Sequence, residues 1–371
     1  MHATFRQPQA VASVPIAAYF DEAVFAAEQQ RLFGQSPQYA GHERMVPECH
    51  DYHVLAHDPG LVLVHTAAGL RLLSNVCRHR QALILEGRGH ARTFTCPLHR
   101  WTYRHDGRLL LAPHFPTNPL LHLAEHTLYD WAGLQWRLPP GVAPLSLPSA
   151  LASRFALDDY TFTREVHSSA GYNWKAFIEV YLEDYHVVPF HPGLGHFVSC
   201  EAIDWSFGHD WSLQVVGFAP KVPEARHSQA YYDWFVGMQT YYQGQLPEAA
   251  AMWLLIYPNV MVEWYPMMVV VSTVYPQGVE ASTNIMAFYH LADLAAHPEG
   301  EHWREQSMKA YLETAAEDDV IGLRMQAGRK ALYRRQEEDS GPYQQPLEAG
   351  MAYFHAYLHG HMGPLYAGLR A

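Results

Sequence analysis

The sequence predicts an α+β protein, with a small all-β domain and a larger domain in which helices flank an antiparallel sheet. Short alternating apolar segments separated by Gly, Pro, Asp and Asn fill the region from Tyr39 to Trp136, as is typical of a small β domain. Longer strand-like runs mixed with segregated helical patterns follow, and this mixture favours an α+β architecture. With 371 residues, 49% of them hydrophobic, the chain is long enough for two cores.

The first domain is predicted over residues 39–138, and the prolines between residues 139 and 148 predict a linker. The strands expected in this domain are residues 52–55, 61–65, 70–73 and 102–103. Before it, the spacing of apolar residues predicts an amphipathic helix over residues 16–34.

The second domain is predicted to comprise residues 1–38 and 149–371. Apolar side chains recur at i, i+3, i+4 and i+7 within residues 173–186, which predicts a helix there. A second helix is predicted from about residue 302 to residue 335. The strands expected in this domain are residues 211–218, 252–258 and 260–275.

Charge and hydropathy exclude several classes of partner. The formal net charge is −12, whereas nucleic-acid-binding surfaces are basic. The first twenty residues contain one arginine and no long apolar stretch, so they do not resemble a signal peptide. No apolar segment approaches the roughly 20 residues that span a bilayer. We therefore expect a cytoplasmic protein that binds neither nucleic acid nor membrane.

Two of the four cysteines each precede a histidine by two or three residues, in a repeated pattern. Cys77 precedes His79 by two residues, and after sixteen intervening residues Cys96 precedes His99 by three. In a Rieske [2Fe–2S] cluster, two cysteines hold one iron and two histidines hold the other. Zinc is an alternative, but zinc sites usually pair Cys with Cys and His with His. The mixed pairs favour the cluster over zinc or over four unligated core residues.

The residues around these ligands, Asn75–Arg80 and Thr95–Tyr103, resemble the Rieske domain of aromatic-ring-hydroxylating oxygenase large (α) subunits. Respiratory Rieske proteins carry an additional cysteine in each segment, where Ala82 and Leu98 stand here, so the resemblance is to the oxygenases. It implies a helix-grip-like second domain that binds a mononuclear iron. The sequence departs from the residues usual in the family at four positions: Gln81, Leu98, Arg100 and Val180.

A second group of candidate ligands lies in the larger domain. His186 and His191 are five residues apart, and Pro189 ends the helix between them, so His191 is expected to curl back toward His186. Two histidines and a carboxylate form a facial triad that leaves coordination positions on Fe(II) open for oxygen. Asp318 is the candidate carboxylate, because it shares the apolar face of a predicted helix, where an ionised group needs a partner.

The alternatives to this triad are ordinary ones. The pair of histidines would be incidental among the 25 in the chain, and Asp318 would be a carboxylate near a helix N-terminus. The resemblance favours the triad, since residues 317–326 match the segment that carries the third iron ligand in the family, Glu-Asp followed by seven residues and Gln.

Glu183 lies three residues before His186, on the same face of the predicted helix. The alternative is that Glu183, Lys175 and Glu179 only form a solvent-exposed polar stripe on this helix. In the family, the acid at this position joins a cluster histidine of the neighbouring subunit to the first iron-binding histidine. The resemblance therefore implies electron transfer from His99 of one subunit through Glu183 to His186 of the next, and hence a head-to-tail homotrimer.

The resemblance implies a terminal oxygenase that activates O2 at a mononuclear Fe(II). No flavin or nicotinamide motif is apparent, so a separate NAD(P)H-dependent flavin or iron–sulfur reductase is expected to supply electrons. With a Glu at the bridging position, the sequence is similar to oxygenases that act on quaternary ammonium compounds. This similarity suggests hydroxylation or oxidative demethylation of a quaternary amine or an aromatic compound. The alternatives are a ring cis-dihydroxylating dioxygenase, an electron-transfer Rieske protein without oxygenase activity and a zinc-stabilised binding module.

Candidates for the substrate pocket come from two predicted strands. Aromatic residues hold cationic ammonium groups by cation–π attraction, although core packing is their ordinary role. The candidates are Trp205, Phe207, Val262, Trp264 and Tyr265.

Overall fold

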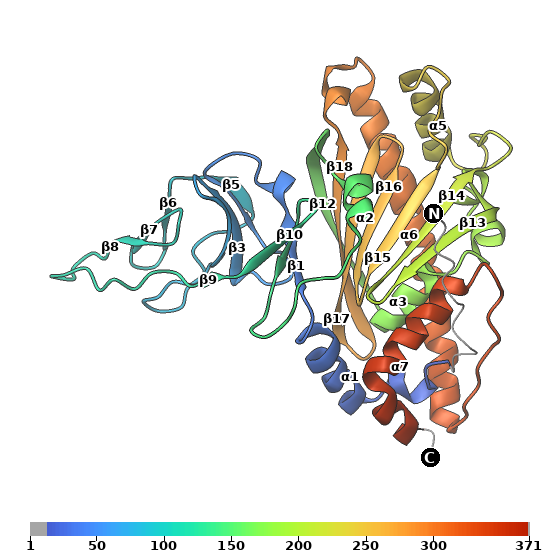
Figure 1. Cartoon of the computed structure of the whole chain (residues 1–371), viewed down its shortest axis with the longest axis horizontal. Coiled ribbons are helices and arrows are strands. Elements are labelled where there is room, and N and C mark those ends of the chain that lie inside the picture. Colours follow the sequence, from blue (N-terminus) through green and yellow to red (C-terminus); the bar gives the residue numbers. More distant parts are fainter. Residues whose placement is uncertain (1–12, 370–371) are drawn as a thin grey trace. The chain divides into compact units, whose positions relative to one another are not determined.

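The structure, a computed structural model, describes residues 13–369. The chain forms two compact units (Figure 1). Phe33–Asp158 form the smaller unit, and the described parts of Met1–Leu32 and Asp159–Ala371 form the larger one. The smaller unit extends beyond residues 39–138 because it also includes the start of strand β1 (Gln38–His42), the Pro-rich segment and helix α2 (Ser149–Phe155).

The smaller unit consists of three antiparallel sheets. Its other strands are β2 (Asp51–Val54), β3 (Leu61–Thr66), β4 (Gly69–Ser74), β5 (Arg88–His90), β6 (Thr93–Thr95), β7 (Thr102–Arg104), β8 (Leu109–Leu111), β9 (Glu125–His126), β10 (Leu128–Trp131) and β11 (Leu134–Arg137). The sheet orders are β5–β2–β3–β4–β9, β6–β7–β8 and β1–β11–β10. The four strands expected from the sequence are confirmed, each to within one residue at either end.

The larger unit is built on one seven-stranded antiparallel sheet. Its strands are β12 (Tyr160–Ala170), β13 (Val198–Gly208), β14 (Trp211–Phe218), β15 (Ala251–Ile256), β16 (Val260–Tyr265), β17 (Met268–Gly278) and β18 (Ala281–Leu291). Their order in the sheet is β12–β18–β17–β16–β15–β14–β13. The single strand predicted at 260–275 is wrong, because Pro266 and Met267, the latter with a φ of +72°, turn the chain into the β16–β17 hairpin.

Helices flank this sheet, as the sequence predicts. They are α1 (Glu22–Glu28), α3 (Trp174–Tyr181), α4 (Val187–Phe190), α5 (Gln229–Tyr241), α6 (Gly300–Arg335) and α7 (Ala349–Leu369), with short helical turns at Ile16–Tyr19, Gln29–Phe33, Leu194–His196 and Ala292–Ala296. A further short turn, Glu43–Met45, belongs to the smaller unit. The helix predicted over residues 16–34 is interrupted. The helix predicted over residues 173–186 begins after Asn173, whose side chain caps the Lys175 amide, but ends at Tyr181.

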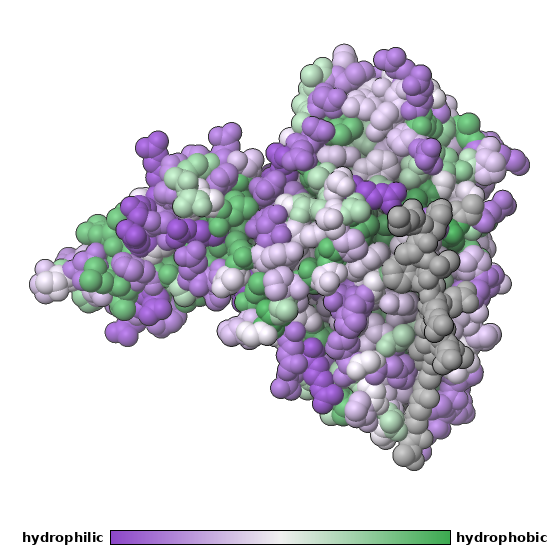
Figure 2. Space-filling view, viewed as in Figure 1, coloured by the Kyte–Doolittle hydropathy of each residue, from purple (hydrophilic) through white to green (hydrophobic). Residues whose placement is uncertain are grey.

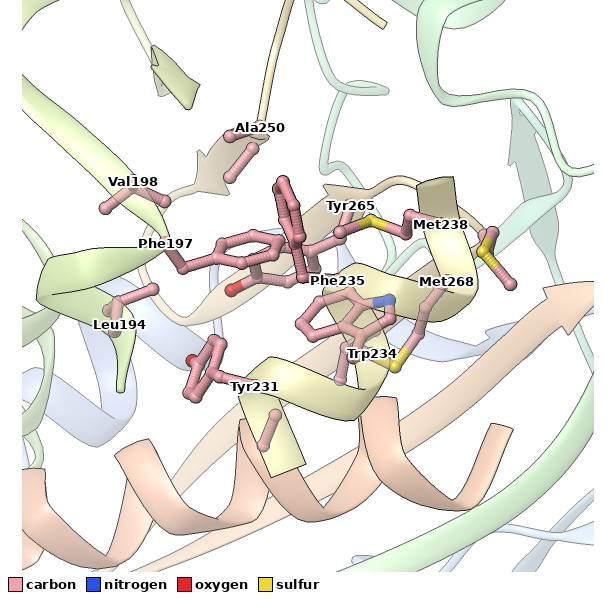
Figure 3. Close-up of a cluster of buried hydrophobic side chains, with 14 of the residues drawn as sticks. Leu194, Phe197, Val198, Tyr231, Trp234, Phe235, Met238, Ala250, Tyr265 and Met268 are labelled. Carbon is pink, nitrogen blue, oxygen red and sulfur yellow. The ribbon is translucent and has the colours of Figure 1, made fainter. Parts of the chain in front are cut away.

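The long helix α6 is tied to the sheet by side-chain hydrogen bonds. The Tyr311 hydroxyl donates to Glu263 on β16 at 2.6 Å, and Ser307 contacts the His290 ring on β18 at 3.1 Å. In Figure 3, aromatic residues of α5 and of the segment before β13 gather around Tyr265, and the rings of Phe197 and Trp234 stack with centroids 4.9 Å apart. This packing holds the helices that carry the site against the sheet.

Helix α3 is anchored by buried ions. The Lys175 ammonium pairs with Glu28 at 2.7 Å, and the Glu179 carboxylate pairs with Arg329 at 2.6 Å and with the His355 ring at 2.9 Å. Lys175, Glu28 and Glu179 have no exposed surface. The alternative that Lys175 and Glu179 form a solvated stripe is therefore wrong. Removing one member of such a pair leaves an uncompensated buried charge, so these contacts fix the position of α3.

Within residues 13–369, no helix is both long and apolar enough to cross a membrane. Figure 2 shows hydrophilic residues interspersed with hydrophobic ones over the visible face of each unit.

Candidate metal centres and substrate cavity

The two Cys–His segments form matching loops in the smaller unit. One lies between β4 and β5, and the other between β6 and β7. In the first loop the Cys77 N–H donates to the carbonyl of Ala82 at 2.9 Å, and the Cys77 carbonyl accepts from the Gln81 N–H at 3.1 Å. In the second loop the Cys96 N–H donates to the carbonyl of Trp101 at 2.8 Å, and the Cys96 carbonyl accepts from the Arg100 N–H at 3.1 Å. The loops therefore present their side chains in equivalent ways.

These loops bring all four candidate ligands together. The thiols of Cys77 and Cys96 are buried, and burial together with the nearby Cys77 thiol raises the pKa of Cys96. The rings of His79 and His99 lie farther out, with their Nδ1 atoms 3.1 Å apart. Two buried sulfurs facing two outward imidazoles match the ligand set of a Rieske cluster, so the residues fit this group.

Tyr103 completes the surroundings of the sulfurs. Its hydroxyl lies 3.4 Å from the Cys77 sulfur and accepts a hydrogen bond from the Arg78 N–H at 3.0 Å. Burial raises the pKa of Tyr103, so the hydroxyl keeps its proton and can donate it to the sulfur.

The structure shows that two of the departures from the family carry a steric cost. Gln81 and Arg100 have φ angles of +57° and +60°. Glycine adopts this left-handed region without steric cost, whereas another residue loses about 1 kcal/mol or more there. Each loop thus carries a strained residue beside a ligand.

In the larger unit, His186, His191 and Asp318 converge. The Nε2 atoms of the two histidines are 3.0 Å apart. The Oδ1 atom of Asp318 lies 3.2 Å from the Nε2 atom of His186 and 3.0 Å from the Nε2 atom of His191. Donor atoms about 2.1 Å from a metal and at right angles stand about 3 Å apart. The spacing therefore fits one face of a six-coordinate metal ion.

Each of these histidines also lies in ion-pair contact with a carboxylate through its other ring nitrogen. The Nδ1 atom of His186 lies 2.6 Å from Glu183, and the Nδ1 atom of His191 lies 2.7 Å from Glu317. Such bonds fix the tautomer of a metal-binding histidine and raise its basicity. Glu317 was missed as a functional residue from the sequence, although its place beside Asp318 is a usable signal.

The neighbouring acid, Asp319, has a different partner. It accepts a hydrogen bond from the Tyr172 hydroxyl at 2.7 Å, and that ring packs so closely on Gly322 of α6 that a Cβ atom there would lie 2.6 Å from it. Of Asp318 and Asp319, only Asp318 therefore contacts the two histidines.

A cavity with an empty volume of about 770 Å³ opens beside the triad. One wall is a stripe along α6 formed by Tyr311, Thr314, Ala315 and Asp318. The opposite wall consists of side chains from β15 to β18, and residues of α3 and the following loop complete it. The cavity therefore borders the triad at α6 and the seven-stranded sheet on the other side.

The lining of this cavity is acidic. Four carboxylates line it (Glu183, Asp184, Glu263 and Asp318), and none of its described lining residues is a lysine or an arginine. Burial raises the pKa of Asp184 to about 7 and that of Glu263 to about 8. A positively charged guest would relieve the desolvation cost of these groups. Asp184 and Glu263 were not among the site residues predicted from the sequence.

Of the five predicted pocket residues, Tyr265 lines this cavity. Strand β16 turns Met261, Glu263 and Tyr265 toward it, so Val262 and Trp264 face the other side of the sheet. Trp205 and Phe207 also lie away from it. The Trp205 indole donates to the carbonyl of Pro346 at 3.1 Å, and the Phe207 ring stacks on Tyr353 at 4.5 Å.

Comparisons with known proteins agree with both centres. Residues 157–363 match the family model described as "ring hydroxylating alpha subunit (catalytic domain)", and residues 36–126 match the Rieske [2Fe-2S] domain. The putrescine 2-hydroxylase of Ralstonia nicotianae is 47% identical over 346 residues, which cover 93% of this chain and 94% of that protein. The putrescine 2-hydroxylase of Bordetella bronchiseptica is 43% identical, covering 94% of this chain and 84% of that protein.

More distant relatives include the carnitine monooxygenase oxygenase subunit of Escherichia coli, which is 25% identical and covers 76% of this chain and 75% of that protein. Among solved structures, the quaternary ammonium Rieske monooxygenase CntA in complex with L-carnitine superimposes with a TM-score of 0.74. It is 21% identical, and the match covers 96% of both chains, so the fold is shared. The chain therefore belongs to the ring-hydroxylating α-subunit family, and it is the terminal component of a Rieske oxygenase with a [2Fe–2S] cluster and a mononuclear iron.

Proposed function

We propose that this enzyme hydroxylates a small aliphatic diamine, with electrons from a separate reductase. The observation that carries the proposal is the acidic cavity beside the triad, lined by four carboxylates and by no described lysine or arginine. A dication suits such a lining, whereas a neutral aromatic compound leaves it uncompensated. Two relatives, 47% and 43% identical, are named putrescine 2-hydroxylase, and putrescine is a diamine.

In this proposal the metal ligands are the residues selected from the sequence. Cys77, His79, Cys96 and His99 would hold the cluster, and His186, His191 and Asp318 would hold the iron. Iron in such a triad, supplied with electrons, activates O2 beside a bound substrate. Glu183 and Glu317 keep the Nδ1 protons of the two histidines, so that each Nε2 atom faces the metal position.

Electrons would cross between subunits. Glu183 bonds to His186 and keeps 16% of its side chain exposed, and the His99 ring is exposed on the smaller unit. Both ends of a path from His99 of one subunit to Glu183 of the next are thus accessible. Large exposed hydrophobic residues near the cluster loops suit a docking surface: Leu98, Leu110, Leu111, Phe115, Leu120 and Leu121. A head-to-tail homotrimer satisfies these requirements.

Product analysis tests the proposed substrate. Purified enzyme with a compatible reductase, NADH and 1,4-diaminobutane should form an amino alcohol with one oxygen atom, which isotope-labelled O2 traces by mass spectrometry. Consumption of NADH without a hydroxylated product from any diamine would refute the substrate class.

A quaternary ammonium substrate is the second candidate. Seven aromatic residues line the cavity, and aromatic rings hold quaternary ammonium groups by cation–π attraction. These residues are Tyr172, Phe177, Tyr181, Tyr231, Trp253, Tyr265 and Tyr311. Release of formaldehyde from choline, carnitine or glycine betaine would favour this candidate over the diamine.

A further inference from the structure

Glu263 is a buried acid in the wall of the cavity. It lies on β16 with 4% of its surface exposed. The Tyr311 hydroxyl donates to its Oε1 atom at 2.6 Å, and the Tyr265 hydroxyl donates to its Oε2 atom at 3.3 Å. Among the described residues, no lysine, arginine or histidine forms an ion pair with Glu263. When Glu263 is ionised, the two hydroxyls thus support a charge that no cation among the described residues compensates.

An uncompensated buried carboxylate is unfavourable unless a cation joins it. A carboxylate accepts about four hydrogen bonds, so two tyrosines leave acceptor capacity on the cavity side. The Tyr181 hydroxyl, which also lines the cavity, is buried without a hydrogen-bond partner. It offers a second acceptor for a donor in the cavity. An ammonium group, with three N–H donors and a positive charge, satisfies both.

The separation along α6 between the tyrosine that holds this acid and the triad carboxylate suits a short alkyl chain. Tyr311, which holds Glu263, and Asp318 lie on one face of α6, seven residues apart. That spacing is two helical turns, with a rise of about 10 Å. The apolar side of Ala315 and the ring of Phe177 line the cavity as well. A diamine bound at Glu263 can therefore extend its methylene groups along this stripe toward the triad.

We propose that Glu263 binds one ammonium group of a diamine substrate, and that this contact decides which methylene group faces the iron ligands. The inference rests on the proposed diamine hydroxylation. Tyr265 and Tyr311 orient the carboxylate, and the bound ammonium group is fixed at one end of the cavity. A monoamine or a quaternary ammonium compound makes only part of these interactions.

Two substitutions separate substrate binding from a structural role. Glu263→Gln keeps the shape and loses the charge, whereas Glu263→Asp keeps the charge and shortens the side chain. If Glu263 only joined β16 to α6, the shortened side chain would be the more damaging change. If it binds an ammonium group, loss of the charge is the more damaging one. Glu280→Gln is the control, because it removes a partly exposed carboxylate that pairs with Lys330 and does not line the cavity.

Binding of 1,4-diaminobutane is measured by calorimetry on the iron-loaded holoenzyme under argon at pH 8. Glu263→Gln should raise Kd by about 10- to 100-fold, as expected for a lost charge-assisted hydrogen bond. Glu263→Asp should stay closer to the wild type, and Glu280→Gln should equal it. In turnover, Glu263→Gln should oxidise both of the two inequivalent methylene positions of 1,4-diaminobutane, where the wild type oxidises one.

The outcomes are distinct. An unchanged Kd in Glu263→Gln, or a larger loss in Glu263→Asp than in Glu263→Gln, would overturn this inference while the wild type still hydroxylates diamines. A wild type that neither binds nor hydroxylates any diamine would overturn the inference together with the proposed function.

Discussion

Replacing Glu183 with glutamine tests the proposed electron path, and Glu317→Gln is its matched control. Each carboxylate bonds to the Nδ1 atom of one triad histidine, Glu183 to His186 at 2.6 Å and Glu317 to His191 at 2.7 Å. Both substitutions keep the side-chain shape and remove one negative charge. The two variants therefore differ in which histidine they affect and in whether the acid belongs to the path between subunits.

The expected loss of iron affinity is similar in the two variants. A hydrogen bond to a charged group contributes about 1.5–3 kcal/mol and a neutral one about 0.5–1.5 kcal/mol. Replacing a charged carboxylate 2.6–2.7 Å from the histidine Nδ1 atom by a neutral amide thus costs about 1–1.5 kcal/mol. This energy corresponds to a roughly tenfold loss of iron affinity. That magnitude agrees with the 10- to 100-fold range for residues that support metal ligands.

The electron-transfer rates should differ. With iron at saturating concentration, substrate and O2 are mixed with protein whose cluster is reduced, and reoxidation of the cluster is followed by its visible absorption. Glu183→Gln should slow this step by about 100-fold, whereas Glu317→Gln should stay within about threefold of the wild type. Equal rates in the two variants would contradict the path through Glu183.

Three further predictions concern the other buried groups. Tyr103→Phe removes the hydroxyl 3.4 Å from the Cys77 sulfur and should lower the cluster potential by about 20–60 mV in a redox titration; an unchanged potential would exclude that bond. Burial alone would raise the pKa of Glu179, but Arg329 and His355 outweigh it and lower the pKa to about 2. Its stabilisation is therefore present above pH 4.5 and lost as the pH falls toward 2, so urea unfolding should show Glu179→Gln destabilised by about 3–5 kcal/mol at pH 7 and by less at pH 3. Burial raises the pKa of Glu263 to about 8 and that of Asp184 to about 7, so diamine affinity should increase from pH 6 to pH 8 more steeply in the wild type than in Glu263→Gln, where only Asp184 still titrates in this range.

Most of the candidate metal ligands could be grouped from the sequence, because they lie in short local segments. Cys77 and Cys96 are followed by histidines in tight loops, and the structure brings the four side chains together. His186 and His191 are also local neighbours. Asp318 is 132 residues from His186, and only its place on an apolar helix face and the resemblance selected it.

Burial that depends on tertiary packing could not be predicted. Lys175 and Glu179 have the spacing of a solvated helical stripe, but their partners come from α1, α6 and α7, far away in the sequence. In the same way, the alternation of β16 gives two possible inward faces, and only the cavity shows that Glu263 lies on the inner one. A single acid in the apolar run from Val260 to Tyr265 is nevertheless a signal that the sequence contains.

The end of α3 shows a further limit. Apolar periodicity continues to Tyr185, yet the helix stops at Tyr181, and Glu183 and His186 lie in the turn that follows. The side chain of Asp184 points into the cavity wall, where Gln214 donates to it. Hydrophobic periodicity does not locate a helix end, because the residues after it can still be buried.

Iron and sulfide analysis of the wild type and of Asp318→Ala, combined with electron paramagnetic resonance of the reduced proteins, tests the two-centre arrangement most directly. The wild type should contain about three irons and two acid-labile sulfides per chain, and Asp318→Ala should lose one iron while keeping the Rieske signal and both sulfides. A wild type without a Rieske signal, or an Asp318→Ala variant that retains the third iron, would contradict it.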